Sequence, residues 1–403
     1  MMEILLIILY IIFGISIFGL FWTYAGYPIF IWFLSKIIKK EHKYDENYQP
    51  NVSIIIACYN EEKVIGEKLK NILELNYPME KMQVLVVDSA STDNTRDIVR
   101  KYNDKCIELV EQDERKGKAA GLNYALNYAK NDIIVITDAN LYMDTNAIKN
   151  MAKHFSDPKV GVVGCRYFVK KRKSVAETEG TAFFRKYEEF LREKEATVDS
   201  SVNFGSDIYG LRRTLCSFDE KCTLAEDFDV CIRARKRGYM LIHETSAIGY
   251  EYTTPVMKEV INQRKRVMTG AIQVLLKHKS MLFNPRYGFY GVLILPGHRL
   301  VQIMNPFFLI GMFFSSIGIL VLEYNTLIFY LIIIQILGIL SAILSLLILK
   351  LKPDLKILPL QGAKYFVLVQ YSCLLAYLNY FKIRKMEKMN WEKIWGEKQS
   401  RTV

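Results

Sequence analysis

The chain has 403 residues, of which 51% are hydrophobic, and its formal net charge at pH 7 is +12. A mean hydropathy of +0.09 is high for a purely soluble protein, so part of the chain is expected to lie in lipid. The seven cysteines form no CxxC pair and show no metal-ligand spacing with the five histidines, which argues against a zinc site and for reduced thiols facing a cytoplasm.

Residues 1–38 are predicted to be an N-terminal transmembrane segment, because no charged residue occurs between Glu3 and Lys36. As one helix this segment would be about 48 Å long, against a hydrocarbon core of about 30 Å. It is therefore expected to tilt strongly or to break near Gly26 and Pro28. The run is too long for a cleaved signal peptide, and no basic residue precedes it. The "KIIKK" that follows places this end on the cytoplasmic side.

Residues 50–255 have the composition of a soluble domain and alternate strand-like with helix-like segments. In "NVSIIIACYNEEKVIGEKLKNIL" a β-branched run precedes a helical pattern, and "MQVLVVDSASTDNTRDIVRKY" and "DIIVITDANLYMDTNAIKNMAKHF" repeat this order. "KVGVVGCRYF" adds another strand. This alternation predicts an α/β domain with a mostly parallel sheet and with ligands at the ends of its strands. The sequence has no GxGxxG or Walker-type loop, which disfavours a dinucleotide or P-loop enzyme.

Acidic residues follow the predicted strands in the loops "ACYNEE", "VDSASTDNT" and "TDAN", and again in the later "TLAEDFD". A single Asp before a helix, such as Asp88 or Asp138, is more often an N-cap than a catalyst. Acids that converge on one edge of a sheet repel each other unless a cation or a proton intervenes. A divalent metal carried with a phosphorylated ligand is therefore the expected completion of the site.

In the order and spacing of these motifs, together with "RKGKAAGLN", the chain resembles the membrane-bound family 2 glycosyltransferases of the GT-A fold. It resembles more distantly the cellulose, hyaluronan and poly-N-acetylglucosamine synthases. The resemblance covers roughly residues 50–275. It implies that residues 50–255 form a cytoplasmic GT-A (nucleotide-diphospho-sugar transferase) domain flanked by transmembrane helices.

The resemblance also implies roles for individual residues. Asp227, beside Glu226, would take the proton of the acceptor, and Asp138 would bind Mg²⁺ or Mn²⁺. Asn140 stands where the DxD motif of the family has its second acid, and it is either a second metal ligand through its carbonyl oxygen or a turn residue. One carboxylate can suffice when substrate phosphates help to hold the cation. The residues implied to contact the nucleotide sugar, besides Asp138, are Ala57, Tyr59, Asn60, Glu61, Asp88 and Lys118.

Residues 256–300 are predicted to form amphipathic helices at the membrane surface. Processive relatives carry QxxRW in the segment "VINQRKRVMTGAIQVLLKHK", where this chain has Gln263, Arg264, Arg266 and Val267. The missing Trp weakens the case for a polymer-extruding synthase. Arg264 and Arg266 can still pair with a diphosphate, and with Gln263 they are assigned to the nucleotide-sugar site.

Residues 301–382 are predicted to form a C-terminal transmembrane region, and residues 383–403 a basic tail. Three spans in this region would leave the tail outside, against the positive-inside rule. Two spans with an interfacial segment, or a fourth crossing near "GFYGVLILPG", would return the tail to the cytoplasm. Both counts stay open.

The leading hypothesis is an inverting, metal-dependent glycosyltransferase, a multi-pass protein of the cell membrane with a cytoplasmic catalytic domain. It moves a sugar from a nucleotide-diphosphate donor, taken as UDP-linked, to a membrane-associated glycan or lipid-linked acceptor. The alternatives are a processive polysaccharide synthase that extrudes a polymer and a non-catalytic, membrane-anchored nucleotide-sugar-binding protein. Membrane lipids are expected partners and a homo-oligomer stays open. Nucleic acid is not expected, because the basic residues cluster beside the membrane segments.

Overall fold

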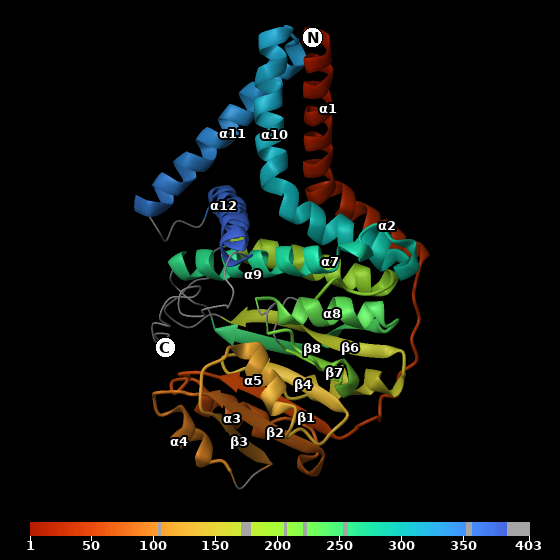
Figure 1. Ribbon diagram of the computed structural model, residues 1–403, viewed down its shortest axis with the longest axis vertical. Helices are drawn as coiled ribbons and strands as arrows, with labels where there is room; N and C mark the ends of the chain where they lie inside the picture. The colour runs from red at the N-terminus through yellow and green to blue at the C-terminus, as the bar shows by residue number, and fades with distance from the viewer. Residues whose placement is uncertain are drawn as a thin grey trace.

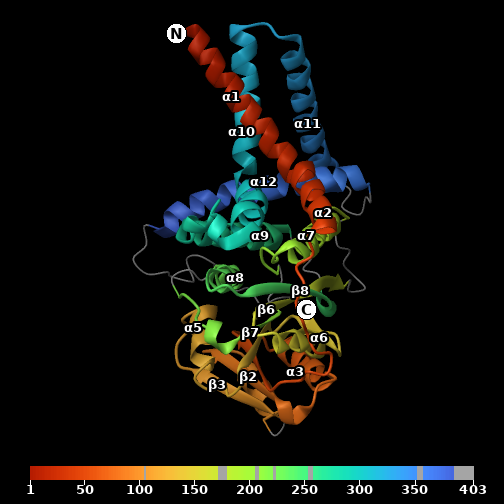
Figure 2. The same ribbon diagram turned by 90° about the vertical axis from the view of Figure 1, so that its right-hand side faces the viewer.

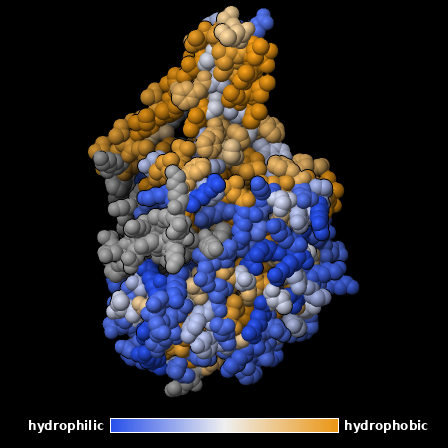
Figure 3. All heavy atoms as spheres, viewed as in Figure 1, coloured by the Kyte–Doolittle hydropathy of each residue, from blue (hydrophilic) through white to orange (hydrophobic). Residues whose placement is uncertain are grey.

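The computed structural model describes residues 1–103, 106–170, 179–204, 208–220, 224–252, 257–351 and 357–384. A sheet with helices on both faces forms the lower part of the molecule in Figure 1, and long apolar helices rise above it. Between these two parts lies a layer that contains α7 and α9. In Figure 3 the surface of the upper helices is hydrophobic and that of the sheet domain is largely hydrophilic.

The sheet has eight strands in the order β3-β2-β1-β4-β7-β6-β8-β5. β1 pairs in parallel with β2 and β4, β2 with β3, and β6 with β8. β7 is antiparallel to its neighbours β4 and β6, and β5 is antiparallel to β8. The predicted mostly parallel sheet is therefore confirmed. The strands are Val52–Cys58 (β1), Met82–Ser89 (β2), Ile107–Gln112 (β3), Ile133–Asp138 (β4), Tyr142–Met143 (β5), Val160–Lys170 (β6), Tyr209–Arg212 (β7) and Met240–Tyr252 (β8).

Both faces of the sheet are buried, as the unbroken β-branched runs of its central strands predict. Side chains alternate between the faces along each strand. In β1, Ile55 packs on the side of α5 and α8, whereas Ile54 and Ile56 pack on the side of α3 and α6. The helices beside the sheet are Ile65–Leu73 (α3), Thr95–Arg100 (α4), Lys118–Ala125 (α5), Ala147–Ala152 (α6) and Glu226–Lys236 (α8), and the layer above contains Glu179–Val198 (α7) and Met257–Lys277 (α9).

The N-terminal helix changes direction close to the predicted break. A π-helical turn, Trp22–Gly26 (η1), joins α1 (Met2–Phe21) to α2 (Tyr27–Ile37), and Figure 1 shows the bend between the two helices. π-helical turns are a recognised cause of such kinks. The strong bend therefore falls where "YAGYP" lies in the sequence.

Within the described residues, four helical stretches are long and apolar enough to cross a membrane by length and composition: Met2–Ile37, Tyr290–Leu322, Thr326–Leu349 and Pro359–Arg384. The segment around "GFYGVLILPG" is not a separate crossing. It forms a π-helical stretch, Tyr290–Leu300 (η7), that continues directly into α10 (Val301–Leu322), so one helix runs across the expected boundary at residue 300.

The last two helices differ in orientation. α11 (Thr326–Leu351) stands with α1 and α10 above the domain, whereas α12 (Leu358–Arg384) lies across the top of α9 (Figure 2). α12 packs on α9 and α7, which belong to the layer above the sheet. Because α12 is itself long and apolar enough to span, the number of C-terminal crossings stays a prediction. The expected tail beyond Arg384 and the expected domain boundary at residues 255 and 256 lie outside the described residues.

Candidate functional site

The candidate site begins at the carboxyl ends of three neighbouring parallel strands. Cys58 lies beside Asp88 in the β1–β2 register, and Ala57 lies beside Asp138 in the β1–β4 register. The loops that follow these strands therefore leave the sheet at one edge. This is the edge at which open α/β sheets bind ligands.

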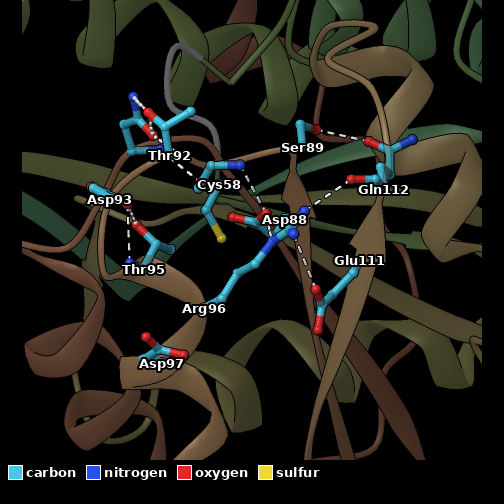
Figure 4. A network of polar contacts seen from close by, with 12 residues as sticks. Cys58, Asp88, Ser89, Thr92, Asp93, Thr95, Arg96, Asp97, Glu111 and Gln112 are labelled. Atoms are coloured by element: carbon cyan, nitrogen blue, oxygen red, sulfur yellow. Dashed lines mark hydrogen bonds and ion pairs between the residues drawn. The ribbon is translucent and has the colours of Figure 1, made fainter.

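Asp88 lies at this edge of the sheet, and its carboxylate is fully buried (Figure 4). Its Oδ1 accepts hydrogen bonds from the Ser91 amide at 3.0 Å and from Arg96 Nε at 2.5 Å. Arg96 also donates to the Gln112 carbonyl at 2.9 Å. The other oxygen, Asp88 Oδ2, is buried with no hydrogen-bond partner among the described residues. A buried acceptor of this kind is costly unless a ligand donates to it.

The loop after β1 is fastened to the loop after β2. Asn60 adopts a left-handed backbone conformation with φ of 53°, which Asn tolerates better than most residues. Its Oδ1 accepts from the Thr92 amide at 2.9 Å, and the Glu61 amide donates to Thr95 Oγ1 at 2.9 Å. Asn60 and the backbone of Glu61 therefore fix the loop that carries the aromatic ring of Tyr59.

The Tyr59 ring is covered by a cation that sequence reasoning did not single out. The guanidinium of Arg115 lies 3.9 Å from the centre of this ring. An arginine stacked on an aromatic face makes a flat, positively charged surface. Such a surface suits a planar base or a phosphate.

Lys118 joins Asp138, in the loop after β4, to the later acidic motif. It is the first residue of α5 and follows Gly117, whose φ of 92° strongly favours glycine. Its Nζ lies 2.8 Å from Asp138 Oδ1 and 2.8 Å from Glu226 Oε1. The structure therefore brings Lys118, Asp138 and Glu226 together, with Asp227 next to Glu226 at the start of α8.

The two aspartates of α8 have opposite electrostatic environments. Burial and the neighbouring Glu226 raise the pKa of Asp227, against smaller lowering effects that include the charge of Lys118. Burial alone would also raise the pKa of Asp229, but hydrogen bonds from His278, Lys277 and Arg233 hold it well below its usual range. Asp229 is thus a permanent anion that ties α8 to α9, whereas Asp227 is the more basic carboxylate.

α9 approaches α8 closely at a glycine. A Cβ placed on Gly270 would lie 2.7 Å from the Ala225 Cβ and 2.7 Å from the carbonyl carbon of Leu224. The absence of a side chain at this position therefore allows α9 to pack on the segment that immediately precedes Glu226. This contact helps to set the position of both acids of the motif.

The loop that holds Asp138 and Asn140 rests on a buried lysine. Lys68 of α3 is fully buried, and its Nζ donates to Thr137 Oγ1 at 2.9 Å and to the Leu141 carbonyl, one on each side of the loop. Burial lowers the pKa of Lys68 to about 7, and the charge of Asp138 partly opposes this effect.

Sequence reasoning missed Lys68, although the signal was present. Position 68 falls on the apolar stripe formed by Ile65, Leu69 and Ile72, so its side chain points into the protein. A lysine on such a stripe needs polar partners inside the fold.

The oxygen donors around Asn140 are those that Mg²⁺ and Mn²⁺ prefer. Asn140 Nδ2 donates to Glu251 Oε2 of β8 at 3.3 Å, so a carboxylate that sequence reasoning did not single out stands beside the loop. Within the described residues, no group of three His, Cys, Asp or Glu side chains is arranged as a metal site. A cation here would therefore depend on substrate phosphate and water in addition to the oxygen donors of this loop.

The structure places the residues of the QxxRW-like segment in different surroundings. Arg264 lies over the rings of Phe184 and Tyr365, at 5.1 and 5.5 Å, and joins α9 to α7 and α12 rather than to Lys118. Gln263 is exposed and Arg266 is half-buried on the same helix. The described contacts of Arg264 are thus structural.

The sequence of residues 53–215 matches the model of a known family, glycosyl transferase family 2. A poly-beta-1,6-N-acetyl-D-glucosamine synthase of Staphylococcus aureus is 26% identical over 272 residues, which cover 62% of this chain and 65% of the synthase. A probable glycosyltransferase of Bacillus subtilis, YdaM, is 29% identical over 266 residues, 60% of each chain. The matches thus span less than two thirds of these relatives.

Among solved structures, a mannosyltransferase from Pyrobaculum calidifontis, in complex with GDP-Man and Mn²⁺, superposes with a TM-score of 0.68. It is 25% identical in sequence, and the superposition covers 94% of this chain and 99% of the mannosyltransferase. The likeness therefore includes the helices outside the sheet domain as well as the sheet.

Proposed function

We propose that this chain is a family 2 glycosyltransferase of the GT-A fold that transfers a sugar from a nucleoside-diphosphate sugar to an acceptor hydroxyl at the membrane surface. The observation that carries the proposal is the contact of Lys118 Nζ with both Asp138 and Glu226, each at 2.8 Å. This contact brings together Lys118, which can bind phosphate, Asp138 in the loop after β4 and Glu226 at the start of α8. These are the groups that such a transfer requires.

The donor occupies the edge formed by β1, β2 and β4 in this proposal. Its base lies on the Tyr59 and Arg115 surface, and Asp88 Oδ2 accepts a hydrogen bond from the base or the ribose. Lys118 contacts the diphosphate. The sequence favours a UDP-linked donor, while the mannosyltransferase with the similar fold was solved with GDP-Man, so both nucleotides belong in the test.

A divalent cation, Mg²⁺ or Mn²⁺, is proposed to be held by Asp138 and Asn140. Support comes from the oxygen donors of this loop and from the Mn²⁺ bound by the structural relative. When bound, the cation neutralises the charge that develops on the leaving diphosphate. The protein residues that act beside it are Lys118, which orients the diphosphate, and Lys68, which fixes the loop.

The proposed transfer is a single displacement that inverts the anomeric carbon. The acceptor oxygen forms a bond to this carbon while the bond to the diphosphate oxygen breaks, and the nucleoside diphosphate leaves with the bonding electrons. Asp227 takes the proton of the acceptor hydroxyl. The raised pKa of Asp227 suits this role, because a general base works best when its pKa approaches the working pH.

We propose that α1, α10 and α11 cross the membrane and that α12 lies at its cytoplasmic surface. The apolar surface of the upper helices and the position of α12 against α9 support this topology. The acceptor then reaches Asp227 from the bilayer side, as a lipid-linked or membrane-associated glycan. A homo-oligomer is compatible with this arrangement.

A processive polysaccharide synthase is the second candidate, and the name of the Staphylococcus aureus relative favours it. A cavity between η1, α7, α10 and α12 bears on this question. It is lined by Tyr24, Phe184, Asn305 and Gln370 among others, and its volume is about 20 Å³. This is room for a single water and not for a sugar, so single transfer fits this helix arrangement better than extrusion through it.

The test uses the full chain in detergent or nanodiscs with a panel of UDP- and GDP-linked sugars, and measures release of free nucleotide with Mn²⁺, Mg²⁺ or EDTA. We expect one donor to give cation-dependent release that increases when membrane lipids from a producing cell are added. Donor binding with no release under any condition would favour the non-catalytic alternative. Products that grow in length without dissociating would favour the processive one.

A further inference from the structure

A side-chain hydrogen bond joins the loop after β4 to the end of β8. Asn140 Nδ2 donates a hydrogen bond to Glu251 Oε2 at 3.3 Å. Backbone pairing holds this contact in place, because Tyr142 pairs with Tyr250 and their rings stack at 5.6 Å with an interplanar angle of 19°. Glu251 follows Tyr250 directly, so its position beside the loop is fixed by the β5–β8 ladder.

The contact explains the amide at position 140. An amide N–H donates favourably to a carboxylate. An aspartate at the same position would bring a second carboxylate next to that of Glu251, and two such groups repel unless a proton or a cation separates them. The amide of Asn140 is therefore compatible with the negative charge that Glu251 of β8 places beside it.

This inference rests on the proposed metal-dependent transfer. We propose that Glu251 supplies the second negative charge of the divalent-cation site, with Asn140 as its hydrogen-bond partner. The charge that a DxD motif carries within one loop is here divided between the loop and β8. The amide nitrogen of Asn140 faces Glu251, and in this proposal its carbonyl oxygen is a neutral cation ligand alongside the Asp138 carboxylate.

The experiment measures Mn²⁺ binding by the full-length protein in detergent, with UDP or GDP present, from the loss of the electron paramagnetic resonance signal of free Mn²⁺. Glu251→Gln keeps a hydrogen-bond acceptor for Asn140 and removes only the charge. Its Mn²⁺ affinity is expected to fall about 10- to 100-fold, the usual effect of losing a carboxylate that supports a metal site. Glu74→Gln, the same change at an exposed residue, is the control and should leave the affinity unchanged.

The exchange variant Asn140→Asp/Glu251→Gln returns the charge to the loop and keeps the hydrogen bond in the reverse direction. Its Mn²⁺ affinity should recover to within about 3-fold of wild type. Thermal unfolding of each variant shows whether the fold is intact, and the exchange variant provides the comparison if Glu251→Gln proves unstable.

Two results would overturn the inference while leaving the proposed function in place: Glu251→Gln that binds Mn²⁺ as tightly as wild type, or an exchange variant that folds but binds no better than Glu251→Gln. A different result would remove the metal dependence itself, and this inference with it. That result is a wild-type protein that binds UDP or GDP and shows no Mn²⁺ binding, with Asp138→Asn indistinguishable from it.

Discussion

Replacing Lys68 by methionine should remove a specific pH dependence of stability. The unfolded lysine titrates near 10.5, whereas burial lowers the pKa of Lys68 in the folded protein to about 7. Between these two values the unfolded state binds more protons than the folded state, so the free energy of unfolding rises with pH. Below pH 7 both states carry the proton, and the contribution of Lys68 no longer changes with pH.

The size of the effect follows from the two pKa values. Where the unfolded state binds one full proton more than the folded state, the free energy of unfolding rises by about 1.36 kcal/mol per pH unit. Because Lys68 is half-titrated at the start of the range, the wild-type protein should gain about 2 kcal/mol between pH 7 and pH 9 relative to Lys68→Met. For a domain of this size that corresponds to about 4 °C in the unfolding midpoint.

The assay is thermal unfolding of the full-length protein in detergent at pH 7, 8 and 9, with EDTA present so that no cation contributes. Lys70→Met is the matched control, because Lys70 lies on the same helix with its side chain 58% exposed. The absolute stability of Lys68→Met is not diagnostic. Removal of the buried charge stabilises the fold, while the unpaired Thr137 and Leu141 oxygens destabilise it. Parallel midpoint curves for wild type and Lys68→Met would refute the reasoning.

Three further outcomes follow from the site. Asp227→Asn should lower turnover about 10²- to 10⁴-fold with donor binding unchanged, as measured by nucleotide release and calorimetry; turnover within 10-fold of wild type would contradict the assignment of the base. Since the pKa of Asp227 is raised, kcat should fall as the pH drops through values above those of an ordinary aspartate, and a rate unchanged down to pH 4 would contradict this. Gly270→Ala forces a Cβ against Leu224 and should lower kcat at unchanged donor affinity, whereas a fully active, equally stable variant would show that the α8–α9 contact does not position the acids.

The central strands were predictable because burial on both faces demands unbroken β-branched runs. β1, β2, β4 and β6 all lie in segments that the sequence identifies as strands. β3, β5, β7 and β8 were not identified. β5 has only two residues, and β8 includes His243 and Glu244, whose polar side chains find partners only after folding. Such strands form because they pair with segments that are distant in the sequence, and a local sequence pattern cannot predict this pairing.

The candidate site, like the sheet, could be predicted from the sequence only in part. Asp88, Asp138 and the acids of α8 follow recognisable strands or open a helix, so their convergence could be expected from the topology. Lys68 and Glu251 contact the loop after β4, one from a helix and the other from the end of a strand that the sequence did not identify. Their roles depend on contacts between elements, which periodicity within one element cannot indicate.

The orientation of α12 has a consequence for the two ends of the chain. If α1, α10 and α11 cross the bilayer and α12 rests on its surface, the number of crossings is odd, and the amino and carboxyl termini face opposite compartments. The basic residues after α2 and the Lys382 and Arg384 side chains at the end of α12 then share the compartment of the sheet domain. A label at the end of α12 would then report the compartment of the sheet domain, while one at the start of α1 would report the other side.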